Sequence, residues 1–306
     1  MTTNRSERVL ASREAPLKIF LLTVAALVCF AFNSILCRMA LGGGHIDAAS
    51  FTLIRVVSAA LTLSLILAFT SGKSRLFERQ KKGSIISAFF LFAYAAAFSF
   101  AYLGLTTGTG ALILFGCVQA TMLIYGLVKG ERPGALEWTG LFAALGGLVY
   151  LVFPGLESPP LSSSLLMGVA GVAWGFYTLR GKGTEDPVAV TSGNFVFAVP
   201  MAIIAALPFV AAEFITVRGA LLATASGAVA SGIGYSIWYA ALRGHSSSSA
   251  AIVQLSVPVI AAFGGVLLIG EAVTLRLAIA SALILGGIWL AIRGRRRGRK
   301  QDGQDG

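Results

Sequence analysis

The chain has 306 residues, of which 56% are hydrophobic and only 12% charged, and its mean hydropathy is +0.82. A soluble domain carries about twice that share of charge. The composition therefore excludes an ordinary soluble protein and indicates a polytopic membrane protein. The formal net charge of +11 would suit a nucleic-acid-binding protein, but its distribution along the chain favours another interpretation, given below.

Apolar segments of membrane-spanning length follow one another along the chain. A spanning helix needs about 20 predominantly apolar residues. We expect such helices at residues 17–39, 48–70, 84–104, 108–128, 134–153, 162–180, 190–211, 217–242, 246–268 and 274–293. The first run is too long for a signal peptide and lacks an obvious small-residue cleavage site. The sequence therefore predicts an all-α membrane protein with ten transmembrane helices and no separate soluble domain.

Basic residues are concentrated in alternate loops. With a cytoplasmic N-terminus, 20 of the 24 Lys and Arg residues fall on the cytoplasmic side, and the exceptions are Arg38, Arg55, Arg218 and Arg276. The positive-inside rule demands this asymmetry. We therefore expect a multi-pass protein of the cell inner membrane with both termini in the cytoplasm. The basic surplus orients the chain in the lipid bilayer, and no nucleic-acid partner is expected.

Short patterns recur about 140 residues apart. Gly130-Glu131 recurs as Gly270-Glu271 (270 − 130 = 140), and Gly146-Gly147 recurs as Gly286-Gly287 at the same offset. Because five spans are an odd number, a second copy enters the membrane in the opposite sense, as in many transporters. The predicted order is a basic N-terminal arm at 1–16, a first five-helix repeat at 17–153, a linker loop at 154–161, an inverted second five-helix repeat at 162–293 and a basic tail at 294–306.

Ten spans, the five-plus-five repeat and a Gly-Glu pair ending the fourth span of each half together resemble the drug/metabolite transporter superfamily and its EamA-type exporters. Arg55, within Phe51 to Ala60, resembles the arginine that these families carry early in their second span, and Gln254 to Glu271 resembles their ninth span and its exit. The likeness covers residues 17–293 and is strongest to the YddG-type amino-acid exporters. It implies export of aromatic or other neutral amino acids by alternating access. Drugs, nucleosides and other small metabolites are the alternative substrates.

A transport path needs polar groups inside an apolar bundle, where such groups are costly. Asn33 and Ser34 lie deep in the first expected span, Gln119 lies in the fourth and Gln254 lies in the ninth. Each side chain could hydrogen-bond a substrate amine or carboxylate. Each could equally bond across a pair of packed helices, so these residues are candidates with two open interpretations.

Aromatic residues occur at corresponding places in the two halves. Tyr94 and Phe98 lie one helical turn apart in the third span. The other candidates are Trp174 and Tyr177 in the sixth span and Tyr235 and Trp238 in the eighth. A lining of rings would suit amphipathic solutes of modest size, because each ring adds apolar area and Tyr or Trp adds one polar group. Helix packing is the alternative role.

Pro200 in the seventh span and Pro258 in the ninth interrupt the backbone hydrogen bonds of their helices. They are candidate gating hinges or fixed kinks. No acidic residue or histidine lies at mid-span to relay protons, and no phosphate-binding glycine-rich loop is present. We therefore expect a facilitator without enzyme activity, cofactor or metal site, in which one chain forms the path. Proton coupling and a channel are the alternatives, and the inverted repeat favours a carrier.

Overall fold

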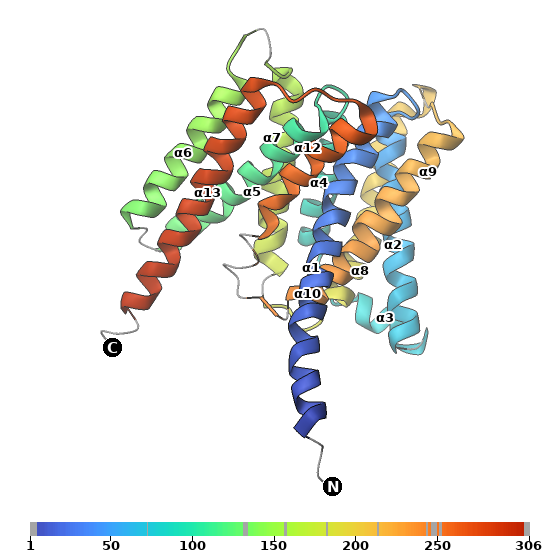
Figure 1. The fold of residues 1–306 in the computed structure, drawn as a ribbon. Helices are drawn as coiled ribbons and strands as arrows, with labels where there is room; N and C mark the ends of the chain where they lie inside the picture. The colour runs from blue at the N-terminus through green and yellow to red at the C-terminus, as the bar shows by residue number, and fades with distance from the viewer. Residues whose placement is uncertain are drawn as a thin grey trace.

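The computed structural model describes residues 5–71, 73–130, 134–155, 158–181, 183–212, 214–242, 244–245, 250 and 253–302. These residues form a helical bundle (Figure 1) with one isolated antiparallel bridge, between Ile46 and Ile215. Eight helices in it are long and apolar enough to cross a membrane. They are Leu17–Gly42, Ala48–Thr70, Thr107–Val128, Ala135–Val152, Leu161–Gly181, Pro187–Ala211, Val217–Leu242 and Leu275–Gly294.

Two shorter apolar helices, Ile85–Ala101 and Ser256–Ile269, lie where the third and ninth spans were expected. The prediction of an all-helical, multi-pass membrane protein is thereby confirmed. The predicted count of ten spans is reached only if these two shorter helices are added to the eight of full spanning length.

The helices keep the order that the apolar runs predict. The N-terminal part contains α1 (Arg5–Gly42), α2 (Ala48–Ser71), α3 (Lys73–Gln80), α4 (Ile85–Ala101), α5 (Thr107–Val128) and α6 (Ala135–Val152). The C-terminal part contains α7 (Leu161–Gly181), α8 (Pro187–Ala206), the 3-10 helix η1 (Leu207–Ala212), α9 (Val217–Ala225), the π-helix η2 (Ser226–Ile233), α10 (Gly234–Leu242), α12 (Ser256–Ile269) and α13 (Leu275–Asp302). Helices α9, η2 and α10 are continuous and form one long span.

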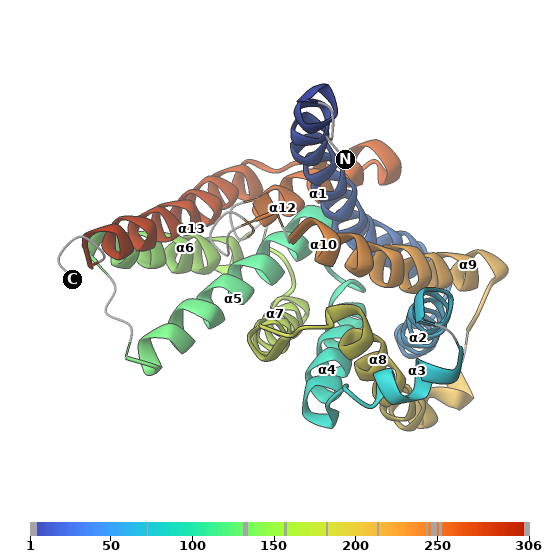
Figure 2. The same ribbon diagram turned by 90° about the horizontal axis from the view of Figure 1, so that it is seen from below.

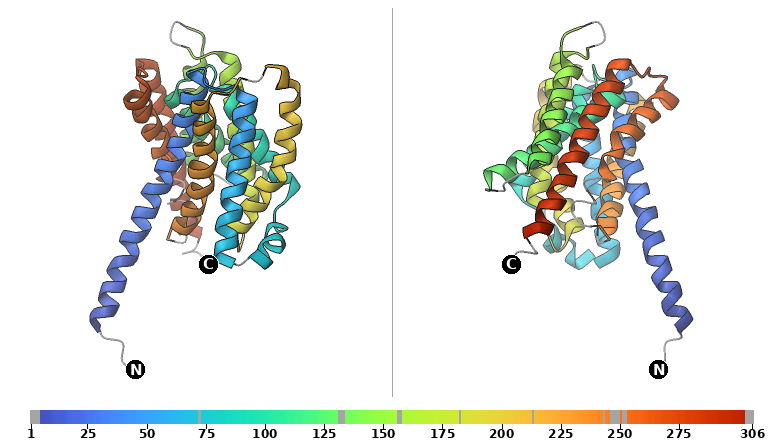
Figure 3. Two further views of the ribbon diagram at one scale, coloured as in Figure 1. Left: turned by 90° about the vertical axis from the view of Figure 1, so that its right-hand side faces the viewer. Right: turned by 60° about the vertical axis from the view of Figure 1, so that its left-hand side comes forward.

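Helix α1 begins, and helix α13 ends, on the same side of the bundle (Figures 1 and 3), and α3 lies on that side too. We call this side the terminal face. The other side, where α1 ends and α9 begins, is the opposite face. The first span shares one helix with residues 5–16 of the expected N-terminal arm, and α13 continues through the expected tail to Asp302.

Helices from the two parts of the chain interleave instead of forming separate bundles. Helix α2 packs on α8, α5 on α12 and α6 on α13, while α4 packs on α7 and α10 packs on α1. Seen from below, the pair α6 and α13 lies at one side, and α5 runs between this pair and α7 (Figure 2). The remaining helices surround the region in which the candidate site lies.

Glycines bring α6 and α13 close together. A Cβ atom at Gly147 would collide with Leu283 and Ile284, and one at Gly287 would collide with the backbone at Gly140, whereas Gly146 and Gly286 face open space. In both repeated Gly-Gly pairs, the second glycine therefore faces the partner helix and the first does not. Small residues serve this purpose in membranes because close van der Waals packing must hold the helices together.

Candidate functional site

Aromatic and polar side chains gather between α1, α2, α4, α7 and α10. We call this group the central cluster, and it consists of Asn33, Arg55, Tyr94, Phe98, Trp174, Tyr177 and Tyr235. All of these side chains are buried except Trp174, which is half-buried. Five separate helices contribute to the cluster, so its geometry depends on how the two parts of the chain pack together.

Trp174 on α7 is the central ring of the cluster. Its ring centroid lies 4.8 Å from that of Tyr94 on α4, 5.3 Å from that of Tyr235 on α10 and 5.2 Å from that of Tyr177 on its own helix. Ring pairs at such separations contribute about 0.5–1.5 kcal/mol each beyond the burial of their area. The indole therefore joins helices from both parts of the chain.

The phenol of Tyr94 is the polar centre of the cluster. Its oxygen accepts hydrogen bonds from Asn33 Nδ2 at 3.1 Å and from Arg55 Nη2 at 2.9 Å. Asn33 Oδ1 in turn accepts a hydrogen bond from Ser226 Oγ at 2.6 Å. Ser226 is the first residue of the π-helix η2, and single π-helical turns inside α-helices are frequent at functional sites. One phenol thus connects α1, α2 and α4, and through Asn33 also η2.

Arg55 is a fully buried cation, with only 1% of its surface exposed. Its Cζ atom lies 5.1 Å from the ring centroid of Tyr94 and 4.9 Å from that of Phe98. The Nη1 atom has no hydrogen-bond partner among the described residues. In the sequence, Arg55 stands out only by its resemblance to a family arginine, whereas the structure brings it to the candidate site residues.

Two further candidates lie beside the central cluster. Ser34 is buried, and its side chain hydrogen-bonds to the Tyr102 phenol. Trp238 is buried in a smaller apolar cluster with Ala26. Its ring contacts that of Phe30 at 5.7 Å, and Phe30 contacts Tyr235 at the same distance. Among the described residues, the ring of Phe30 therefore connects Trp238 to the central cluster.

The two glutamines lie apart from the cluster. Gln119 is buried in α5, and Gln254 is half-buried just before α12. No hydrogen bond among the described residues connects either side chain to the central cluster. The two prolines differ from each other. Pro200 lies inside α8 and is exposed, whereas Pro258 lies in the first turn of α12, where a missing N–H costs no helical hydrogen bond.

The opposite face is tied by an ion pair between the two parts of the chain. Arg38 Nε donates to Glu271 Oε1 at 3.2 Å, and Arg38 Nη1 donates to the Tyr102 carbonyl at 3.1 Å. Glu271 Oε2 accepts a hydrogen bond from the Thr107 amide at 2.8 Å. We call these four residues the opposite-face clasp. The repeat relates Glu271 to Glu131, which lies outside the described residues.

A second contact on this face joins the α1–α2 loop to the segment before α9. Asp47 accepts hydrogen bonds from the Ser50 amide at 2.8 Å and the Phe214 amide at 3.3 Å. Partial burial raises the pKa of Asp47, but its hydrogen bonds with Ser50, Phe214 and Ala49 outweigh that effect and hold the pKa below its ordinary value. The stabilising charge is therefore present at neutral pH and is lost as the pH falls through this lowered pKa.

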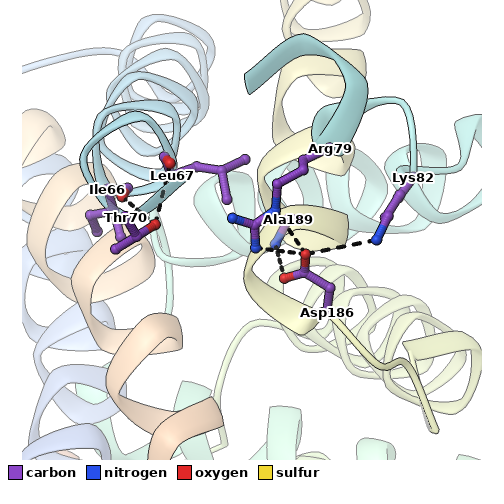
Figure 4. Close-up of polar contacts among 7 residues, drawn as sticks. All are labelled: Ile66, Leu67, Thr70, Arg79, Lys82, Asp186 and Ala189. Atoms are coloured by element: carbon purple, nitrogen blue, oxygen red, sulfur yellow. Dashed lines mark hydrogen bonds and ion pairs between the residues drawn. The ribbon is translucent and has the colours of Figure 1, made fainter. Parts of the chain in front are cut away.

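The terminal face carries a separate polar clasp (Figure 4). Arg79 of α3 donates to Asp186 Oδ2 from Nε at 2.9 Å and from Nη2 at 2.6 Å, and Lys82 lies 3.9 Å from the same oxygen. Asp186 also caps α8 by accepting a hydrogen bond from the Ala189 amide. We call Arg79, Lys82 and Asp186 the terminal-face clasp. It joins the N-terminal part of the chain to α8.

A column of rings connects the regions of the two clasps. It runs from Tyr102 through Phe98, Tyr94 and Trp174 to Tyr177, with centroid separations of 4.8, 5.4, 4.8 and 5.2 Å. At one end Tyr102 accepts from Arg38 through its carbonyl. At the other end the Tyr177 phenol accepts a hydrogen bond from Asn194 of α8 at 3.4 Å. The central cluster supplies every ring of this column except Tyr102.

The arrangement is suited to binding a small solute. It offers a guanidinium N–H without a partner, an amide and three phenols, all set among aromatic rings. Within the described ranges, no group of three or more His, Cys, Asp or Glu side chains is arranged to hold a metal ion. The chemistry available is therefore hydrogen bonding, charge pairing and ring stacking.

Comparison with known proteins relates the chain to membrane transporters. The EamA-like transporter family matches residues 161–293. An uncharacterized protein of Pseudomonas aeruginosa is 48% identical over 89% of this chain and 93% of its own length. An uncharacterized transporter of Archaeoglobus fulgidus is 29% identical over 63% of this chain and 70% of its own, and a second from that organism is 25% identical over 62% and 70%.

A solved crystal structure has the same overall fold. It covers 91% of this chain and 98% of its own, with a TM-score of 0.60. The two sequences are only 19% identical. This likeness concerns the arrangement of the helices alone.

Proposed function

Because the chain belongs to the EamA-like transporter family of the drug/metabolite transporter superfamily, we propose that it exports amino acids across the cell inner membrane by alternating access. The family makes it a transporter of small molecules. Aromatic or other neutral amino acids are the substrates that we propose within that class. The central cluster is the observation that carries this proposal.

An aromatic amino acid matches the central cluster group by group. Its carboxylate needs hydrogen-bond donors, which Asn33 and Arg55 supply. Its ring needs flat apolar partners, which Trp174 and Tyr235 supply at 5.3 Å from each other. Its ammonium group can lie over electron-rich ring faces. The proposed binding site thus consists of the central cluster with Ser34 and Trp238 beside it.

We further propose that the ten apolar helices form two inverted five-helix repeats, at 17–153 and 162–293. The mutual packing of α2 with α8, α5 with α12 and α6 with α13 is what a two-fold axis between such repeats requires. The equivalent roles of Gly147 and Gly287 support the same relation. The basic ends of α1 and α13 on the terminal face support a cytoplasmic location for both termini. One chain is sufficient for this path.

The protein is proposed to act as a facilitator. The carboxylates whose surroundings are described lie near helix ends or in loops: Asp47, Glu78, Glu137, Glu185, Asp186 and Glu271. A proton-coupled carrier commonly uses an acidic group or histidine along its path. Acidifying one side of a proteoliposome should therefore drive no uphill accumulation of solute. Uphill accumulation in that experiment would favour the proton-coupled alternative.

Other small metabolites are the alternative substrates. The ring column accepts many flat solutes, because stacking discriminates weakly between them. Nucleosides and aromatic drugs therefore belong in the same assay as amino acids.

The test is counterflow. Proteoliposomes are loaded with one unlabelled solute each, and uptake of labelled phenylalanine is followed. We expect saturable exchange with aromatic amino acids, weakened about tenfold by Trp174→Ala, because the ring of the solute loses the indole on which it is proposed to stack. Trp138→Ala is the matched control, since Trp138 is exposed on α6. Exchange with nucleosides or drugs but with no amino acid would contradict the proposal.

A further inference from the structure

We propose that Arg55 is the carboxylate-binding residue of the central cluster, so that the protein selects small solutes bearing a carboxylate beside a flat apolar group and discriminates against organic cations. This inference rests on the proposed function for the location of the site. It adds a requirement that the transport proposal leaves open, namely that the carboxylate is essential and the amine is not.

Arg55 is a buried cation whose hydrogen-bond donors are not all satisfied among the described residues. Arg55 is 1% exposed, and its Nη2 atom bonds to Tyr94 while Nη1 has no partner among the described residues. A buried charge is costly unless it is paired and hydrogen-bonded. The rings of Tyr94 and Phe98 on the guanidinium offset only part of this cost. An anionic ligand would supply the missing acceptor.

The surroundings of Arg55 hold no carboxylate paired with it among the described residues. The titratable groups close enough to interact electrostatically with Arg55 are Tyr94, Tyr235 and Cys37. Phenols and thiols are ordinarily neutral at pH 7. Each ion pair among the described residues lies elsewhere, at Arg38, Arg79, Lys81 or Lys82. The cluster therefore has a positive charge that only a bound solute would neutralise.

The geometry of Arg55 suits a carboxylate. A guanidinium binds a carboxylate best through two parallel N–H groups, and Arg55 has one N–H edge that its present contact with Tyr94 does not use. Asn33 Nδ2 bonds to the same phenol and is a second donor within the cluster. A carboxylate bound there would place the rest of the solute beside Tyr94. The ring of Tyr94 contacts that of Trp174, with 4.8 Å between the two centroids. A flat apolar group would stack there.

The amine of a bound solute would meet ring faces and a like charge in the central cluster. Among the ion pairs of the described residues, none brings an acidic side chain into the central cluster that could hold an ammonium group. Ring faces attract a cation, but Arg55 repels it. An amino acid is therefore bound chiefly through its carboxylate and its side chain. Aromatic acids without an amine should be ligands, and aromatic amines without a carboxylate should not.

The experiment compares three ligands that differ in one group each. Binding to the purified full-length chain is measured by isothermal calorimetry with phenylalanine, with 3-phenylpropionate, which lacks the amine, and with phenethylamine, which lacks the carboxylate. We expect the first two to bind within about tenfold of each other. We expect phenethylamine to bind about a hundredfold more weakly, since a charge-assisted contact is lost and a like charge remains.

Two variants connect the effect to Arg55. Arg55→Gln should weaken binding of both carboxylates about a hundredfold and strengthen binding of phenethylamine, because the repelling charge is removed. Arg55→Lys should weaken binding of both carboxylates about tenfold, because the charge stays but the planar guanidinium is lost. Melting temperature and gel filtration verify folding. Should Arg55→Gln fail to fold, phenylalaninamide on the unaltered protein is the second measurement, and we expect it to bind as weakly as phenethylamine.

The outcomes separate this inference from the transport proposal. Amino-acid counterflow together with equally tight binding of phenethylamine would overturn the inference and leave the transport proposal standing. Arg55-dependent binding of phenylpropionate without any amino-acid exchange would support the inference and contradict the proposed amino-acid transport. If neither carboxylate binds, the inference is overturned as well.

Discussion

At the scale of single residues, Tyr94 holds the central cluster together. Its phenol accepts hydrogen bonds from Asn33 and Arg55, and its ring contacts Phe98 and Trp174. One side chain of α4 thus touches residues of α1, α2 and α7. Removing only its hydroxyl leaves two buried donors without an acceptor while preserving the ring contacts.

Tyr94→Phe should therefore weaken both binding and folding. We expect the KM for phenylalanine exchange to rise about tenfold and the free energy of unfolding to fall by about 1–3 kcal/mol, because buried donors lose their partner. Counterflow and thermal melting measure the two effects. Tyr125→Phe is the matched control, since Tyr125 is exposed on α5 and should tolerate the change. An unaltered KM in Tyr94→Phe would contradict a role of this phenol in the site.

The sequence could predict some members of the cluster but not how they meet. Tyr94 and Phe98 are one helical turn apart, so local spacing alone puts them on one face of α4. The contact of Arg55 with both rings joins α2 to α4 and depends on long-range packing. Gln119 met the same criterion as Asn33, a polar residue within an apolar run. It lies apart because composition does not reveal which neighbour a residue faces.

At the scale of helices, the packing of α6 on α13 depends on glycines at single positions. Gly287 lies against the backbone at Gly140 and Ala144, whereas the adjacent Gly286 faces open space. The two positions have the same residue type and the same helical conformation. They differ only in what surrounds them, so they form a natural pair for mutation.

Gly287→Ala should destabilise the protein by about 1–3 kcal/mol, because the added methyl group would force the two helices apart. Gly286→Ala should be neutral or stabilising by up to about 1 kcal/mol, since alanine favours a helix over glycine. Melting temperatures in detergent test both expectations. Equal effects of the two substitutions would show that α6 and α13 do not pack through this face.

Apolar runs predicted the helices well, because a membrane segment must satisfy its backbone through the hydrogen bonds of a helix and present apolar side chains over a length that the bilayer fixes. The short helix α3 was not predicted, since its eight residues are mostly polar and lie between two spans. The π-helix η2 was also missed: it packs on α2 and α1, which are distant in the sequence, and residue type does not reveal such contacts. Pro258 was expected within a span, yet it lies where α12 begins.

At the scale of the whole molecule, polar contacts tie the two parts of the chain together on both faces. The opposite-face clasp joins Arg38 to Glu271, and the terminal-face clasp joins Arg79 to Asp186. The ring column runs through the central cluster from Tyr102, which is hydrogen-bonded to Arg38, to Tyr177, which is hydrogen-bonded to Asn194 of α8. The proposed alternating access requires the contacts on one face to break while those on the other hold. The clasps are therefore the contacts whose strength should set the balance between the two states.

Glu271→Gln should open the opposite face. Loss of the charge-assisted contacts with Arg38 and Thr107 favours the open state roughly tenfold. With the native cysteines replaced, a cysteine at Ser34 should react about ten times faster with an impermeant maleimide added at the opposite face. Glu185→Gln is the control, because Glu185 is exposed and near the terminal-face clasp. An unchanged labelling rate would mean that the clasp does not control access.

The central claim is that substrate binds in the cluster around Trp174, Tyr94 and Arg55. Its most direct test is a crystal structure of the protein grown with 4-iodophenylalanine, in which anomalous scattering locates the iodine. We predict one strong peak beside the rings of Trp174 and Tyr235, with the ligand carboxylate on Arg55. A peak at the surface between α6 and α13, or elsewhere outside the cluster, would contradict the account.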